Sequence, residues 1–229
     1  MDPAEDVASL QVAKTFKWFE IARQEQRRGS LSRALAASKR AEAAARRSGD
    51  EENVSATLIM TGEILMRQGR LPEARRSYRE ALAIHERLAR KHPGTSASSH
   101  AVSVLREKFG ELAIAEGNPA KALEDFQASL DIRTRLVEAD PANNQWSRDL
   151  SVAHEKIGDV LMDQGHLADA LECFRASVTI GQRLIKIDPD NAEWSRDLAI
   201  SWGKGRHGAR RAGQPSRGAR VLSGGASEA

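Results

Sequence analysis

A run of residues that returns at a fixed spacing constrains this chain more than any other feature. The segment DPANNQWSRDLSVAHEKIGDV begins at Asp140, and DPDNAEWSRDLAIS begins at Asp188, 48 residues later. The same spacing relates earlier residues, and one further step back shortens to 40 residues. The matching sets are Gly62, Gly110 and Gly158; Gly29, Gly69, Gly117 and Gly165; Tyr78, Phe126 and Phe174. Self-similarity at a fixed period of this length is typical of arrays of stacked structural units.

Each copy holds two helical stretches joined by a short glycine-containing turn. In the fourth copy, WSRDLSVAHEKIGDVLMDQG precedes HLADALECFRASVTIGQRLIKID, and the apolar residues follow the i, i+3, i+4, i+7 spacing of an amphipathic helix. Gly165 suits a helix end that needs a positive φ, and Pro189 stops the second helix. Because no strand-like alternation is present in the body of the chain, we predict an all-α fold of antiparallel helical hairpins.

Small residues recur at places where two helix axes would cross. Gly110 and Gly158 stand midway along first helices, and Phe126 and Phe174 on the second helices would fill the space beside them. One hairpin cannot bury both of its faces, so neighbouring hairpins must stack. The sequence therefore predicts a core that is shared between successive copies.

These segments resemble the tetratricopeptide repeat family. The resemblance is carried by TGEILMRQGRLPEARRSYREAL, FGELAIAEGNPAKALEDFQASL and IGDVLMDQGHLADALECFRASV, and by a more divergent first copy that starts at Trp18. The units are longer than the about 34 residues usual in the family, as in long-helix variants similar to kinesin light chain arrays and bacterial signalling proteins. The resemblance implies a right-handed superhelical solenoid over residues 7–202. Its expected units are 7–44, 51–92, 98–140 and 146–188, followed by a truncated first helix at 193–202.

The resemblance also implies a concave groove, lined by the first helix of each unit, that holds a peptide or a partner helix. Acidic residues stand where relatives that clamp a C-terminal carboxylate would need Asn or a cation, so we expect no such ligand. An acidic stripe with an apolar end suits a protein or peptide partner with basic and apolar residues; the alternative is a merely solvated helix face. The expected groove residues are Phe19, Glu20, Arg23, Ile59, Met60, Glu63, Glu107, Lys108, Glu111, Glu155, Lys156 and Asp159.

We expect an interaction scaffold, as the repeat region of a larger signalling protein, and no catalysis, cofactor, metal site or small-molecule substrate. None of the six histidines stands in an H-x-x-x-H or H-E-x-x-H pattern. The single cysteine, Cys173, lies where two other units have Ser77 and Asp125. The chain starts with acidic residues, and no stretch approaches the about 20 apolar residues of a membrane span. We therefore expect a cytoplasmic protein without membrane contact.

The basic character of the chain belongs to its last residues. The net charge is +3, from 35 Lys and Arg against 32 Asp and Glu, but residues 203–229 hold six of the basic residues and only one acid, Glu228. The rest of the chain is therefore slightly acidic and offers no net attraction for nucleic acid. Residues 203–208, GKGRHG, match the spelling of a dinucleotide-binding loop, but they follow a helical stretch instead of a strand.

We expect disorder in residues 1–6 and 203–229, with fraying near residue 202. Gly, Arg and Pro make the last segment hostile to a helix. Back-translation with a shift of one nucleotide permits residues that continue the repeat, so we hypothesise that 203–229 is an out-of-frame fifth repeat. The alternative is an arginine- and glycine-rich arm through which an adaptor binds nucleic acid.

Overall fold

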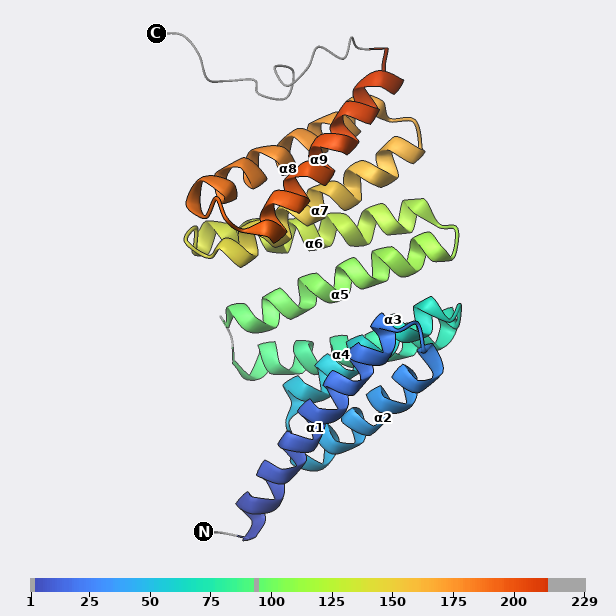
Figure 1. Ribbon diagram of the computed structural model, residues 1–229, viewed down its shortest axis with the longest axis vertical. Helices are drawn as coiled ribbons and strands as arrows, with labels where there is room; N and C mark the ends of the chain where they lie inside the picture. Colours follow the sequence, from blue (N-terminus) through green and yellow to red (C-terminus); the bar gives the residue numbers. More distant parts are fainter. Residues whose placement is uncertain (1–2, 93–94, 214–229) are drawn as a thin grey trace. The chain divides into compact units, whose positions relative to one another are not determined.

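Every regular element in the described part of the chain is an α-helix, which confirms the predicted all-α repeat fold (Figure 1). The computed structural model describes residues 3–92 and 95–213. The chain divides into two compact units, Met1–Asn118 (unit 1) and Pro119–Ala229 (unit 2). Its helices are α1 (Pro3–Arg27), α2 (Leu31–Ser48), α3 (Glu51–Arg67), α4 (Leu71–Lys91), α5 (Ser96–Ala115), α6 (Pro119–Ala139), α7 (Asn144–Asp163), α8 (Leu167–Ile187) and α9 (Ala192–Arg211).

Unit 1 stacks its helices in chain order. Each of α1 to α4 packs against the next helix along the chain, and α1 also touches α3. The core between them is closed by fully buried side chains, including Ile64, Tyr78, Leu105 and Leu112. Tyr78 meets the ring of Phe109 edge to face, with 6.0 Å between the ring centroids. First helices of successive hairpins are therefore neighbours, as a stacked array requires.

Unit 2 repeats this arrangement with α6 to α9. Helix α7 packs on α6 and α8, helix α9 packs on α8, and α7 also touches α9. Leu171, Phe174, Val178 and Leu184 are buried in its core. None of the described helices in either unit combines the length and the apolar character needed to cross a membrane.

Glycine has two separate roles that the sequence predicts. At the turns, Gly29, Gly69, Gly117 and Gly165 adopt φ values from 74° to 84°, a region that side chains with a Cβ rarely enter. At the helix crossing, a Cβ on Gly158 would lie 2.7 Å from Cε1 of Phe174, so only glycine permits this approach. The aromatic residue therefore fills the place that the glycine vacates.

The repeated segment before α7 and α9 ends the preceding helix and then supplies an N-cap for the next one. Asn143 Oδ1 accepts a hydrogen bond from the backbone N–H of Trp146, and Asn191 Oδ1 accepts one from Trp194, at 3.1 Å each. Asp50 caps α3 in the same way through Asn53 N, at 2.9 Å. Such caps satisfy N–H groups that have no partner within the helix. The duplicated sequence thus fixes where each first helix begins.

The prediction of disorder at the two ends is wrong for residues 3–6 and 203–211, which are helical. Helix α1 begins at Pro3, and α9 runs on through residue 203 to Arg211. Gly205 and Gly208 are buried in α9, and a Cβ on Gly208 would lie 3.2 Å from Leu171 Cδ2. Close packing on α8 thus outweighs the helix-breaking cost of about 1 kcal/mol per glycine. Residues 214–229 of the predicted tail lie outside the described residues.

The amino-acid sequence as it stands keeps the repeat register beyond residue 203. Lys204 follows Lys156 by 48 residues, and Gly213, with φ 68°, follows Gly165 by the same distance. These two matches need no change of frame. The frameshift hypothesis stays a prediction, to be tested on the coding DNA.

Candidate functional site

The expected groove residues of α1 are accessible. Glu20 and Arg23 are exposed and lie 4.0 Å apart as an i, i+3 ion pair, whereas Phe19 is half-buried and packs against the core. Phe16, one turn earlier on the same helix face, is 60% exposed. The face therefore presents an aromatic surface beside both signs of charge.

Helix α3 contributes less to an open surface than expected. Met60 is only 5% exposed and belongs to the core, which corrects its expected place in the groove. Ile59 is half-buried and packs against the same core. Met60 on α3 holds the register position of Lys108 on α5. Lys108 has Glu63 on the preceding first helix, whereas Met60 has Arg23 of α1 at the matching place. An apolar side chain meets no carboxylate there and packs inward.

Lys108 of α5 neutralises two of the expected acidic residues. Its Nζ lies 2.8 Å from Glu63 Oε1 on α3 and 3.2 Å from Glu111 Oε2 on its own helix. Burial disfavours the ammonium charge, but Glu111 and Glu63 outweigh burial, and the pKa of Lys108 is raised. Glu107, next to it, is half-buried. The predicted acidic stripe is thus largely an internal ion-pair cluster in unit 1.

Lys204 of α9 also pairs with two of the expected acidic residues, in unit 2. Its Nζ lies 3.1 Å from Glu155 Oε2 and 2.7 Å from Asp159 Oδ2, both on α7. Burial opposes its charge, but the hydrogen bond that Lys204 donates to Asp159 and the charges of both acids raise the pKa of Lys204. Lys156, 48 residues earlier, is half-buried. The equal spacing of Lys108, Lys156 and Lys204 was the signal that could have found this contact.

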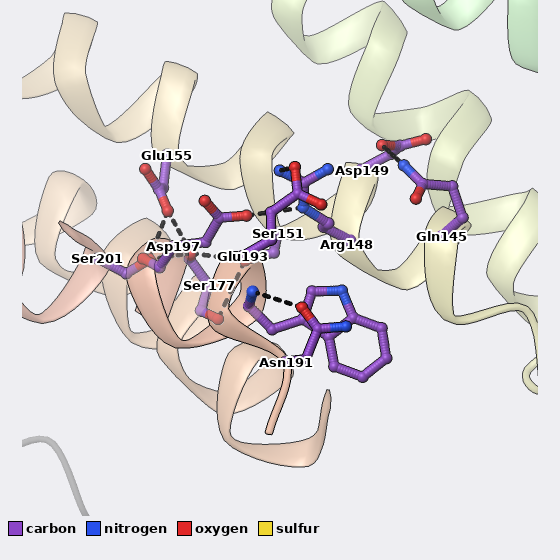
Figure 2. Close-up of polar contacts among 11 residues, drawn as sticks. Gln145, Arg148, Asp149, Ser151, Glu155, Ser177, Asn191, Glu193, Asp197 and Ser201 are labelled. Atoms are coloured by element: carbon purple, nitrogen blue, oxygen red, sulfur yellow. Dashed lines mark hydrogen bonds and ion pairs between the residues drawn. The ribbon is translucent and has the colours of Figure 1, made fainter. Parts of the chain in front are cut away.

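A buried polar network surrounds Glu155 (Figure 2). Ser177 Oγ lies 2.8 Å from Ser151 Oγ and 2.9 Å from Ser201 Oγ, and it donates to Glu155 Oε1 at 3.1 Å. Ser201 also donates to Glu155 Oε1. Glu155 is 9% exposed, so the structure places it inside unit 2 and not on the open groove face that the sequence predicted. The carboxylate stays buried because hydroxyl groups and Lys204 satisfy it.

Arg148 joins the first helices of unit 2 at their other end (Figure 2). Its Nε lies 2.7 Å from Asp197 Oδ2, and its second terminal nitrogen lies 2.9 Å from Glu193 Oε1, both on α9. Burial works against its charge, but the bond and charge of Asp197 dominate and the pKa of Arg148 is raised. Two cations, Arg148 and Lys204, therefore hold α9 against α7.

Burial shifts the pKa values of one histidine and of the single cysteine in unit 2. Burial lowers the pKa of His154, which keeps its ring neutral. Burial, with the charges of Glu172 and Asp169, raises the pKa of the Cys173 thiol, and a protonated thiol is a poor nucleophile. Within the described residues, no three His, Cys, Asp or Glu side chains are grouped so that they could hold a metal ion.

Comparison with known proteins agrees with this architecture. A family model described as tetratricopeptide repeat matches residues 56–116. BtubC (BKLC) from P. vanneervenii is 14% identical, with a TM-score of 0.67 over 97% of this chain and 89% of that one. Nearly identical TPR-like repeats of a putative kinesin light chain from Podosopora anserina are 18% identical, with a TM-score of 0.62 over 90% and 89%. No curated protein matches the chain in sequence.

The family match falls on the residues that form the helix crossing and the turn. The model match includes Gly62, Gly69 and Tyr78, the crossing glycine, the turn glycine and the aromatic residue of the second hairpin. The same three roles recur at Gly158, Gly165 and Phe174 in unit 2. Residues 56–116 therefore match the tetratricopeptide repeat family, and the helical hairpins of the chain share the fold of TPR-like repeat proteins.

Proposed function

We propose that this protein is a non-catalytic scaffold that holds a peptide or a helix of a partner protein against the first helices of its repeats. The observation that carries the proposal is Phe16, an aromatic side chain that is 60% exposed beside Phe19 and Glu20 on α1. Exposed aromatic residues next to charged groups are typical of interface anchors. The partner then contributes apolar residues against Phe16 and basic residues near Glu20.

Fewer carboxylates are free to bind a basic partner than the sequence suggested. Glu63 and Glu111 are already paired with Lys108, and Glu155 and Asp159 with Lys204. A basic partner would have to compete with these lysines. We therefore assign most of the affinity to apolar contacts and only the orientation to charge.

The alternative function, a nucleic-acid adaptor, depended on the basic residues from Gly203 onward. Lys204 is the first of them, and it is committed to two carboxylates on α7. A phosphate would gain little from a cation that is already paired and half-buried. We therefore do not extend the proposal to nucleic acid.

Variant-dependent partner capture tests the proposal. The full chain is immobilised as wild type, as Phe16→Asp, and as the control Ile187→Asp, which changes an exposed isoleucine on the second helix α8. We expect Phe16→Asp to lose proteins that both the wild type and the control retain, with unchanged helical circular dichroism. Identical capture by all three forms would overturn the proposal.

A cytoplasmic location and a role as the repeat region of a larger signalling protein complete the proposal. The single cysteine, Cys173, is a free thiol, which suits a reducing compartment. An antibody against the array should detect a soluble-fraction polypeptide larger than 25.1 kDa in cell extracts. A band at 25.1 kDa alone would remove the signalling part of the proposal.

A further inference from the structure

A cavity of about 290 Å³ lies between α3, α4 and α5 in unit 1. Its polar lining comes from Glu52 and Ser55 on α3, His85 on α4 and His100 on α5. Short and aliphatic side chains, among them Ala101, complete the wall. The space is large enough for the end of a long side chain, whereas a single water molecule occupies about 30 Å³.

Two buried polar atoms on this wall have no hydrogen-bond partner among the described residues. They are Ser55 Oγ and His85 Nδ1, and the two residues are 0% and 8% exposed. Leaving a buried donor or acceptor without a partner costs about 1–3 kcal/mol. Each such atom needs an explanation, and a bound group that donates to it is one.

Unit 2 shows what the same serine does when its partners are present. Ser151 holds the register position of Ser55, 96 residues later, and it bonds to Ser177 at 2.8 Å. In unit 1 the position of Ser177 is taken by Ala81, and that of Glu155 by Ile59. Apolar residues thus stand in unit 1 where the partners of Ser151 stand in unit 2.

The space itself has the same origin. In unit 2, the Arg148 side chain crosses from α7 to Asp197 on α9 at 2.7 Å. At the corresponding positions unit 1 has Glu52 and Ala101. The guanidinium and its carboxylate partner are therefore both missing from unit 1, and a carboxylate now faces the vacated space from the α3 side.

The lining of the cavity is suited to a positive charge. None of the described residues on its wall is Lys or Arg. Burial lowers the pKa of His85, against the opposing charge of Glu52, so the ring is neutral and its Nδ1 can accept a hydrogen bond. The Glu52 carboxylate and the Ser55 hydroxyl are further acceptors.

We propose that this cavity binds the cationic side chain of a lysine or arginine from a partner peptide. The charged group pairs with Glu52 and donates to Ser55 Oγ and His85 Nδ1, while the aliphatic stem lies against Ile59 and Ala101. The identity of the ligand as part of a partner protein rests on the proposed function. The preference of the cavity for a cation does not.

Titration of the full chain with n-butylguanidinium chloride, followed by NMR, tests the cavity directly. We expect saturable shifts at the backbone amides of Ser55 and Ala101 and at the ring nitrogens of His85. N-butylurea has nearly the same shape and no charge, and it should bind at least about tenfold more weakly, the equivalent of one lost charge-assisted bond. Equal shifts with both compounds, or no saturable shift with either, would overturn the proposal.

Two variants with matched controls separate charge from space. Glu52→Gln should weaken n-butylguanidinium binding about tenfold, and Ala101→Leu, which fills the cavity, should abolish the shifts. The controls Glu86→Gln and Ala36→Leu change exposed residues elsewhere in unit 1 and should bind like the wild type. Unaltered binding by Glu52→Gln would show that the carboxylate does not recognise the cation.

The two proposals can fail separately. If the probe binds but Phe16→Asp captures the same proteins as the wild type, the cavity stands and the partner-binding face of α1 falls. If Phe16→Asp loses its partners but the probe does not bind, the scaffold stands and the cavity is only a packing defect.

Discussion

Helices α3, α4 and α5 of unit 1 and helices α7, α8 and α9 of unit 2 follow one register, 96 residues apart, but treat the same buried serine differently. Around Ser151 the chain supplies hydroxyl groups and the carboxylate of Glu155. Around Ser55 it supplies a cavity. Both sets keep the crossing glycine, the aromatic residue and a lysine paired with the preceding first helix. The repeat frame therefore depends on few positions, and those between them are available for other uses.

The largest effects should come from breaking what the two sets share. Gly62→Leu and Gly158→Leu would each force a side chain into the ring of Tyr78 or Phe174, and we expect a loss of about 3 kcal/mol in the free energy of unfolding. Urea denaturation measures the loss. The control is Gly203→Ala, since a Cβ there meets nothing within 4 Å. It should be neutral or stabilising by up to about 1 kcal/mol, and a cost similar to that of the crossing glycines would contradict the packing argument.

Removing the lysine of the network should affect unit 2 alone. Lys204→Met leaves the buried carboxylate of Glu155 without its cation, and we expect a loss of about 2 kcal/mol, less than for a fully buried pair because Lys204 is 30% exposed. Hydrogen exchange should show faster opening of α9, with α3 to α5 unchanged. Arg206→Met, an exposed neighbour on the same helix, is the control. Protection of α9 equal to that of the wild type would show that Lys204 contributes little.

Two histidines, the buried His85 and the half-buried His154, should make stability depend on pH in the same direction. Burial lowers the pKa of His85 in unit 1 and of His154 in unit 2, so the unfolded chain binds more protons than the folded chain just below the ordinary histidine pKa of about 6.5. The free energy of unfolding should therefore fall as the pH drops below about 6.5. His85→Asn should reduce this slope, and His207→Asn, an exposed substitution, should not. A slope that does not change in His85→Asn would mean that the cavity already hydrates the ring.

The smallest effect should come from making unit 1 resemble unit 2. The double substitution Glu52→Arg with Ala101→Asp copies the pair of Arg148 and Asp197 into the cavity. We expect a gain of about 0.5 kcal/mol in the free energy of unfolding, more than the sum of the single changes. The double variant should also lose the n-butylguanidinium shifts. Retention of those shifts would place the probe outside the cavity.

The repeat spacing was enough to predict the fold and the positions of the turn glycines. It also predicted the contact between Gly158 and Phe174, because both residues recur at each copy. The spacing could not predict that Met60 and Glu155 are buried. A register assigns a residue to one face of a helix, but its exposure depends on the side chains that the next helix brings to that face.

The end of α9 shows a second limit. Propensity counted each glycine after residue 203 against a helix. Burial of Gly205 and Gly208, with Gly208 packed on Leu171 of α8, reversed that result. The candidate cavity could not be predicted for a related reason. It depends on the small size of Ala81 and Ala101, which is informative only when these residues are compared with their equivalents in unit 2.

The lysine contacts have the same direction along the chain in each unit. Lys108 on α5 reaches back to Glu63 on α3, and Lys204 on α9 reaches back to Asp159 on α7. On α9 the residue in the register of Glu63 and Asp159 is His207. A further helix with a lysine in this register would meet an imidazole instead of a carboxylate. An ion pair between α9 and such a helix would therefore need a residue other than lysine in this register.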